Sequence, residues 1–407
     1  MRFSRHVLLL VVFCLSVTLS VAGVRHERSR QQHPEETRAL WVVRYSLTSP
    51  EAIRNIVREA KSHGFNTLFV QVRGRGDAWY SSDLEPRAEA LSGQPVSYDP
   101  LKLIIEAAHS NGIKVNAWMN TYLSWTGKNH PRSARHIINA HPEWIARDNS
   151  NAYTTIATDH CEGAFLQPSN PAVQDHIFKV FTDVARRYDV DGIHFDYVRY
   201  PGKNYDMSDS TLKRFQKYIS PELTPVGIAA VKADKTRLAY IHNFPERWEQ
   251  WRRVQVTDLV KRISREVHSI KPDLEVSAAV FAEANDARAD KGQDWREWLS
   301  QGYLEAICPM AYSKNTDTVF RQIAEAVAAA NGRKVYAGLG AWRLTAQDTA
   351  VKIEKARAAG ANGVNLFSWD GITNEGKNMA FLDYISRNCF APQTVQKADL
   401  PGTELPE

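Results

Sequence analysis

The stretch that decides the fold is Val190–Pro201, Val-Asp-Gly-Ile-His-Phe-Asp-Tyr-Val-Arg-Tyr-Pro. Side chains alternate between the two faces of a strand, so His194 and Asp196 share one face, and Ile193 and Phe195 share the other. Helices cover the apolar face of a parallel strand, which turns the His194/Asp196 face toward a polar interior. Asp196 is therefore predicted at the carboxyl end of a buried strand, where α/β barrel enzymes hold their chemistry.

Around this stretch, Glu36–Phe390 alternates β-rich runs with helical patterns. The other predicted strands are Thr37–Tyr45, Phe65–Arg73, Ile113–Asn120, Leu274–Phe281, Glu305–Tyr312, Lys334–Leu339 and Gly363–Trp369. Amphipathic helices are predicted between them, which makes eight strand–helix units and predicts a single (β/α)₈ TIM barrel without a second domain. Two long segments, Thr121–Ser169 after strand three and Gly202–Phe244 after strand four, are expected to form walls around the barrel mouth.

The two ends of the chain differ from this body. Met1–Ala22 has a basic start, an apolar run and a small-residue cleavage site, which is the pattern of an export signal. Residues 23–35 are interpreted as a linker, and residues 391–407, rich in proline, as a flexible tail. The sequence therefore predicts an exported protein, periplasmic or secreted, without a membrane span.

Composition excludes several other functions. A formal charge of +5 over 407 residues is modest, and no basic module interleaved with aromatic residues suggests nucleic-acid binding. Neither cysteine nor histidine pairs have the spacing of metal ligands, so no metal site is predicted. Glycine-rich phosphate loops are missing too, which argues against a barrel for phosphorylated metabolites and predicts no cofactor.

Polar and aromatic residues instead gather where the predicted strands end. Convergent polar groups ringed by aromatic side chains are typical of a sugar-binding cleft. The residues predicted to contact sugar are Arg73, Asp77, Asn120, His194, Arg199 and Tyr312, with Trp342 and Trp369 stacking on sugar rings.

Hydrolysis of a glycosidic bond commonly uses two carboxyl groups, one as acid and the other as nucleophile or base. Asp196 is the first candidate, against the alternative that it only pairs with Arg199. Glu283 is the second candidate, because it continues the strand face of Ser277, Ala279 and Phe281 on the next strand. Its rivals are Asp77 and Asp370.

Several motifs, in matching order, resemble the glycoside-hydrolase-like family 10, formerly a domain of unknown function. They include Arg38–Val42, Phe69–Arg73, Asp77–Tyr80, His141–Trp144, Phe165–Pro171, Val190–Tyr197, Trp251–Arg253 and Pro309–Tyr312. The resemblance implies an exported barrel that acts on bacterial polysaccharide. One described relative is a divisome-localised glycosidase that cuts peptidoglycan strands freed of their stem peptides.

The chain departs from the family pattern at two places. Many relatives have Phe-Asp-Asp where this chain has Phe195-Asp196-Tyr197, so only Asp196 carries over. The end of the fifth strand, Val280–Glu283, also differs from the family type. Residues 191–196 further resemble the strand of chitinase-type barrels, in which the acetamido group of the substrate is the nucleophile, so a substrate-assisted mechanism stays open.

We therefore expect a glycoside hydrolase of a cell-envelope polysaccharide, with peptidoglycan or a related amino-sugar polymer as the expected substrate. The alternative is a barrel that binds envelope glycan without cleaving it.

Overall fold

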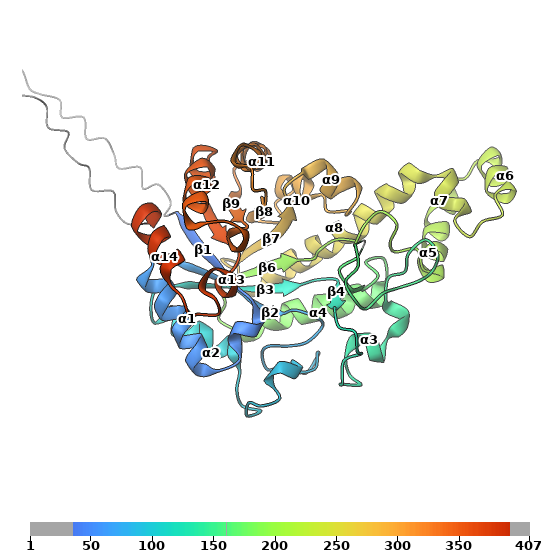
Figure 1. The fold of residues 1–407 in the computed structure, drawn as a ribbon. Coiled ribbons are helices and arrows are strands. Elements are labelled where there is room, and N and C mark those ends of the chain that lie inside the picture. The colour runs from blue at the N-terminus through green and yellow to red at the C-terminus, as the bar shows by residue number, and fades with distance from the viewer. Residues whose placement is uncertain (1–35, 160, 391–407) are drawn as a thin grey trace, which may run out of the picture. The chain divides into compact units, whose positions relative to one another are not determined.

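The computed structural model describes residues 36–159 and 161–390. Within them, eight parallel strands close into a barrel in the order β1-β10-β9-β8-β7-β6-β3-β2 (Figure 1). The barrel strands are β1 (Thr37–Val42), β2 (Thr67–Arg73), β3 (Lys114–Asn120), β6 (Gly192–Asp196), β7 (Glu275–Phe281), β8 (Ala306–Met310), β9 (Lys334–Leu339) and β10 (Gly363–Leu366). The predicted TIM barrel is confirmed.

Helices form the outer layer, and short polar sequences start several of them. The helices are α1 (Pro50–Ser62), α2 (Pro100–His109), α3 (Ile137–Ala140), α4 (Pro171–Arg187), α5 (Asp209–Ile219), α6 (Pro225–Ala233), α7 (Ala239–Asn243), α8 (Pro245–Ile270), α9 (Ala284–Ala289), α10 (Trp295–Ser300), α11 (Thr316–Ala329), α12 (Ala346–Ala358), α13 (Trp369–Thr373) and α14 (Ala380–Ile385). Ser49, Asp99 and Asn170 each accept a hydrogen bond from a first-turn N–H, and a proline follows each of them. Such caps satisfy otherwise unpaired backbone donors.

The central strand β6 has the two faces that its sequence predicts. His194 points into the barrel, where its ring lies 4.7 Å from Phe69 and 6.2 Å from Trp41. Phe195 points outward and stacks on Phe181 of α4 with ring centroids 4.9 Å apart. Because the alternation continues to the end of the strand, Asp196 lies on the inner face, at the mouth of the barrel.

Two long segments follow β3 and β6. The first carries β4 (Leu123–Trp125) paired with β5 (Ala164–Phe165), together with α3 and the short helix η3 (Pro142–Trp144). The second carries α5, η4 (Ser220–Glu222), α6 and α7, which extend beyond the barrel at the start of α8 (Figure 1). Buried Asp206 joins the two segments, since it accepts hydrogen bonds from Ser169 and Thr211.

Some predicted strands are longer than the observed ones. The first ends at Val42 and not at Tyr45, and the last ends at Leu366 and not at Trp369. Trp369 instead begins α13. The predicted export signal, linker and tail lie outside the described residues. Among the helices of residues 36–159 and 161–390, none combines the length and the apolar character that a membrane span requires.

Candidate active site

A cavity of about 470 Å³ lies at the carboxyl ends of the barrel strands. The residues around it come from most of the strands and from the long segment after β3. They are Trp41, Val43, Arg44, Gln71, Gly74, Arg75, Trp118, Asn120, Leu123, Thr126, Glu162, Asp196, Tyr197, Arg199, Ala279, Phe281, Met310, Tyr312 and Phe367. Charged groups and aromatic rings thus share one space, large enough for a sugar ring or two.

Asp196 is held by two donors and stays partly open to the cavity. Its Oδ2 accepts from the indole Nε1 of Trp118 at 3.0 Å, and its Oδ1 accepts from the backbone N of Tyr197 at 2.6 Å. Burial raises the pKa of Asp196 to about 6, although both hydrogen bonds and Arg199 oppose that rise. Tyr197 has a φ of 48°, a left-handed conformation that is uncommon outside glycine and costs energy at the end of this strand.

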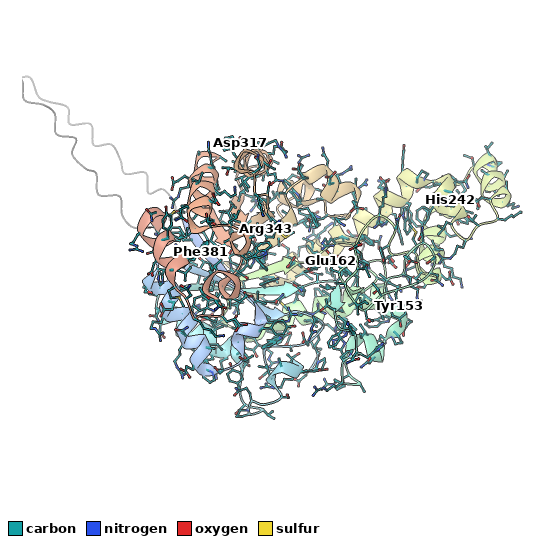
Figure 2. All side chains as sticks on the ribbon, viewed as in Figure 1. Tyr153, Glu162, His242, Asp317, Arg343 and Phe381 are labelled. Atoms are coloured by element: carbon teal, nitrogen blue, oxygen red, sulfur yellow. The ribbon has the colours of Figure 1, made fainter. Side chains whose placement is uncertain are left out.

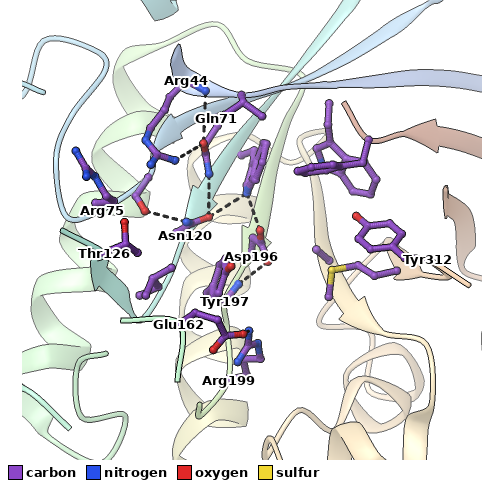
Figure 3. A pocket seen from close by; sticks show the side chains of 18 of the residues that line it. Arg44, Gln71, Arg75, Asn120, Thr126, Glu162, Asp196, Tyr197, Arg199 and Tyr312 are labelled. Carbon is purple, nitrogen blue, oxygen red and sulfur yellow. Dashed lines mark hydrogen bonds and ion pairs between the residues drawn. The ribbon is translucent and has the colours of Figure 1, made fainter. Parts of the chain in front are cut away.

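A chain of side-chain hydrogen bonds continues from Asp196 across the floor of the cavity (Figure 3). Strand register places Asn120 of β3 beside Asp196 of β6. The Oδ1 of Asn120 accepts from Trp118 at 3.1 Å and from Gln71 at 3.4 Å, and its Nδ2 donates to the carbonyl oxygen of Gly74 at 2.8 Å. The Oε1 of Gln71 in turn accepts from Arg44 at 2.7 Å. These polar groups are therefore fixed before any ligand arrives.

Glu162 is the second carboxylate that lines the cavity. It belongs to the long segment after β3, which also carries Tyr153 (both labelled in Figure 2). Its Oε1 accepts a hydrogen bond from Arg199 Nη2 at 2.7 Å. Arg199 also lies over the rings of Tyr197, at 4.7 Å, and Phe281, at 5.1 Å. The guanidinium therefore links Glu162 to the β6 end and to the β7 wall.

Aromatic rings form the opposite wall. Tyr312 and Phe367 both line the cavity, with ring centroids 5.9 Å apart. Burial, with a smaller effect from Asp196, raises the pKa of Tyr312 well above its usual value, so its hydroxyl stays protonated and can donate to a ligand. Trp342 packs edge-on against Tyr312 at 5.0 Å. This wall offers the apolar faces that sugar rings pack against.

Four of the predicted site residues line the cavity together: Asp196, Asn120, Arg199 and Tyr312. Glu283 does not. Its carboxylate bonds to Arg321 at 2.6 Å and to Gln322 at 2.9 Å, both on α11, and its side chain is 41% exposed. The strand β7 ends at Phe281, so the alternation that was extended to Glu283 no longer applies after the chain turns into α9.

Two residues that were predicted to contact sugar, Arg73 and Asp77, lie outside the cavity. Arg73 is fully buried, pairs with Glu85 at 2.6 Å and donates to the carbonyl oxygen of Thr121 at 3.0 Å. Burial raises the pKa of Glu85, but Arg73 and His176 outweigh it and hold the pKa near 2. Asp77 is 4% exposed and accepts from the backbone N of Arg75. Arg73 and Asp77 instead form hydrogen bonds with the backbone of neighbouring loops.

His194 also lies below the cavity. It is fully buried, and its Nδ1 lies 2.9 Å from the Ser277 Oγ. Burial lowers its pKa to about 3, so the ring stays neutral. Trp369, which was predicted to stack on sugar, is 2% exposed and belongs to the hydrophobic core. Phe367, two residues earlier, lines the cavity instead. Trp342 is 43% exposed and does not line the cavity itself, but it borders the cavity through its contacts with Tyr312 and Phe367 of the aromatic wall.

The sequence interpretation missed three charged cavity residues, Arg44, Arg75 and Glu162. Arg75 lies two residues past the predicted end of the second strand, so a search just beyond that end would have found it. Arg44 lies inside the predicted first strand, and only the observed end of β1 at Val42 places it beyond the strand. Glu162 lies about forty residues after β3, where only tertiary folding of a long segment brings it to the mouth. In the described part of the chain, no group of three or more histidine, cysteine or acidic residues could hold a metal ion.

Fold and cavity together define a class: a parallel barrel with two carboxylates in an aromatic-walled cavity at its carboxyl end, the arrangement used by glycoside hydrolases. Comparison with known proteins makes this specific. Residues 36–341 match the family described as glycosyl hydrolase-like 10. The chain belongs to that family, and the predicted enzyme class, a glycoside hydrolase, is confirmed.

Two curated relatives carry the same enzyme class in their names. Glycosyl hydrolase DigH of Escherichia coli K12 is 26% identical over 346 residues, which cover 73% of this chain and 70% of the relative. Glycosyl hydrolase YngK of Bacillus subtilis 168 is 24% identical over 314 residues, which cover 69% of this chain and 55% of the relative.

Solved structures show the same fold at low identity. The PgaB (BpsB) glycoside hydrolase domain of Bordetella bronchiseptica aligns with a TM-score of 0.62 at 17% identity, over 86% of this chain and 98% of that domain. The catalytic domain of β-amylase from Paenibacillus polymyxa aligns with a TM-score of 0.61 at 12% identity, over 87% and 97%.

Proposed function

We propose that this protein is an exported glycoside hydrolase that cuts an amino-sugar polymer of the cell envelope, with peptidoglycan strands as the first candidate, and that Asp196 is its general acid. The observation that carries the proposal is the environment of Asp196. A carboxyl group with a pKa near 6 keeps a protonated fraction near neutral pH and can donate that proton to a leaving oxygen. The hydrogen bonds that Asp196 accepts from Trp118 and Tyr197 hold its carboxyl group in one orientation.

Glu162 replaces Glu283 as the proposed second carboxylate. Of the residues that line the cavity, only Glu162 and Asp196 carry carboxyl groups. Arg199 holds Glu162 by a hydrogen bond of 2.7 Å, and in our proposal this carboxylate is the nucleophile or base. In a substrate-assisted mechanism the acetamido group of the sugar would replace it as nucleophile.

The choice of substrate rests on the sequence resemblance and on the proposed export signal at residues 1–22. One member of the family that the sequence resembles, a divisome-localised glycosidase, acts on peptidoglycan strands without stem peptides. Tyr312 and Asn120 offer donors and acceptors to the hydroxyl and acetamido groups of such strands, and Phe367 and Trp342 offer apolar faces.

The test incubates the mature protein with peptidoglycan from which stem peptides have been removed, and with intact peptidoglycan, and measures soluble fragments and new reducing ends. We expect release from the stripped glycan and none from the Asp196→Asn variant. Binding of the glycan without any release would instead favour the non-cleaving barrel.

A second measurement decides the mechanism. If Glu162 is the nucleophile or base, Glu162→Gln loses turnover about as severely as Asp196→Asn, and azide added as an external nucleophile restores part of it. If Glu162→Gln keeps most of its turnover, the acetamido group of the substrate takes that role, and Asp196 remains the acid.

A further inference from the structure

The cavity holds more positive charge than its own carboxylates balance. Three arginines line it, Arg44, Arg75 and Arg199, against the two carboxylates Glu162 and Asp196. Arg199 is paired with Glu162 at 2.7 Å. Among residues 36–159 and 161–390, neither the Arg44 nor the Arg75 side chain forms an ion pair, and the contacts of both guanidinium groups are with neutral groups. Arg44 is buried and Arg75 is half-buried. Because charges removed from water are usually paired, this surplus needs an explanation.

Arg44 is built into the cavity. It is 9% exposed, donates to Gln71 at 2.7 Å and to the Tyr45 hydroxyl at 2.8 Å, and lies over the Tyr45 ring at 4.3 Å. Its Nε is buried without a hydrogen-bond partner. Gly74 leaves the room for it, because a Cβ there would lie 2.4 Å from Arg44 Cδ and 2.6 Å from Nε. The side chain is thus fixed while part of its donor fork stays unused.

Arg75 follows Gly74 directly and brings a second guanidinium to the same end of the cavity. Its Cζ lies 4.3 Å from the centre of the Trp125 ring, and its Nε is also buried without a partner. Figure 3 shows Arg44 and Arg75 on the Asn120 side of the cavity, with Tyr312 across from them. Asp196 and its reacting oxygens lie between these two walls.

From these contacts we infer that Arg44 and Arg75, with Gly74, form an anion subsite that binds a carboxylate carried by the sugar beside the cleaved bond. Two planar guanidinium groups suit a carboxylate, because their N–H donors match its two oxygens. The inference deepens the proposed function and rests on it. It makes the substrate an anionic glycan, whose carboxylate is either a lactyl ether substituent, as on muramic acid without its peptide, or the C6 carboxylate of a uronic acid.

The experiment compares three oligosaccharides: a stripped peptidoglycan strand with free lactyl carboxylates, the neutral chitin oligosaccharide of the same β-1,4 amino-sugar backbone, and a uronic acid oligosaccharide. Dissociation constants are measured on the Asp196→Asn protein and kcat/KM on the otherwise unchanged protein. Because the binding measurement needs no turnover, it still tests the subsite if the proposed hydrolysis fails.

Arg44→Gln and Arg75→Gln are each expected to weaken binding of the carboxylated ligand by about 10- to 100-fold, the size expected for lost hydrogen bonds to a charged group. Binding of the neutral oligosaccharide should change less than about twofold, which also shows that the variants are folded. Whichever carboxylated ligand shows the loss identifies the source of the carboxylate.

Arg343→Gln is the matched control. Arg343 is exposed, lies beside Trp342 and does not line the cavity (labelled in Figure 2). The substitution Arg343→Gln therefore removes the same charge as the other two variants without changing the subsite. The inference is overturned if the neutral oligosaccharide binds as tightly as both carboxylated ones, if the two variants weaken all ligands equally, or if Arg343→Gln has the same effect.

Discussion

Asp196 and Glu283 are acidic residues at the ends of two adjacent barrel strands, and the structure gives them opposite surroundings. Asp196 is the last residue of β6, faces the cavity and accepts hydrogen bonds from neutral donors. Glu283 lies two residues past the end of β7, faces α11 and pairs with Arg321. Burial raises the pKa of Asp196, whereas hydrogen bonds from Arg321 and Gln322 lower the pKa of Glu283.

This contrast shows where the period-two alternation of side chains stops being informative. It depends on extended backbone, so it predicts a side chain's direction only while the strand continues. Trp369 repeats the lesson on the last strand, because β10 ends at Leu366 and the chain then turns into α13.

The largest expected effect separates the two carboxylates by activity. Asp196→Asn should lower kcat by about 10²- to 10⁴-fold, the usual contribution of a general acid. Glu283→Gln should leave kcat within about twofold, because its carboxylate does not reach the cavity. Both constants are measured on stripped peptidoglycan, with unfolding curves to show that the variants are folded. A comparable loss of kcat in the two variants would contradict the assignment of Asp196, and not Glu283, to the reaction.

The pH dependence sharpens the role of Asp196. A general acid must be protonated, so kcat/KM should fall as pH rises through about 6. Trp118→Phe removes a hydrogen bond that favours the ionised form, so the pKa should rise and the alkaline limb should move up by about one pH unit. Trp144→Phe, on the helix η3 away from the cavity, is the control and should leave the limb in place. A limb that moves down in Trp118→Phe would contradict the assignment.

Stability should also respond to pH in opposite directions at the two positions. The folded pKa of Asp196 is above its ordinary value of 3.8, so the native protein loses stability between about pH 4 and pH 6 as this group ionises. Asp196→Asn escapes that loss and should become the more stable protein by about 1–3 kcal/mol at pH 7.

The pKa of Glu283 is lowered, so its ion pair stabilises the native state at neutral pH and the benefit disappears on acidification. Glu283→Gln should therefore be slightly less stable than the unchanged protein at pH 7 and equal to it in acid. Urea unfolding across this range measures both trends, and parallel trends would show that the two environments have been misassigned.

The smallest effect concerns the two tryptophans expected to stack on sugar. Trp342→Ala, at the rim, should weaken oligosaccharide binding by a few-fold with little change in unfolding free energy. Trp369→Phe, in the core, should lower the unfolding free energy by about 1–2 kcal/mol and leave binding unchanged. Calorimetric titration measures the change in binding, and urea unfolding measures the change in stability. If Trp369→Phe weakened binding and Trp342→Ala lowered only stability, Trp369 and not Trp342 would be the residue that contacts sugar.

Much of the barrel could be predicted because its signals are local. The apolar residues of β6 alternate regularly, and capping residues before α1, α2 and α4 mark where helices begin. Asp196 and Asn120 were found for the same reason, since each ends a strand on its inner face and the parallel register pairs them. Arg73 follows the same pattern but does not line the cavity, because its guanidinium pairs with Glu85 from the following segment.

Local signals in the sequence are enough to predict the barrel, the inward face of β6 and one carboxylate at its mouth, because strand periodicity and helix caps act between near neighbours in the chain. Tertiary contacts bring Glu162 into the same cavity as Asp196, turn Glu283 toward Arg321, and place Arg44 and Arg75 at one end of the cavity. Those outcomes depend on where strands end and how long segments fold back, which are set by contacts between residues far apart in sequence.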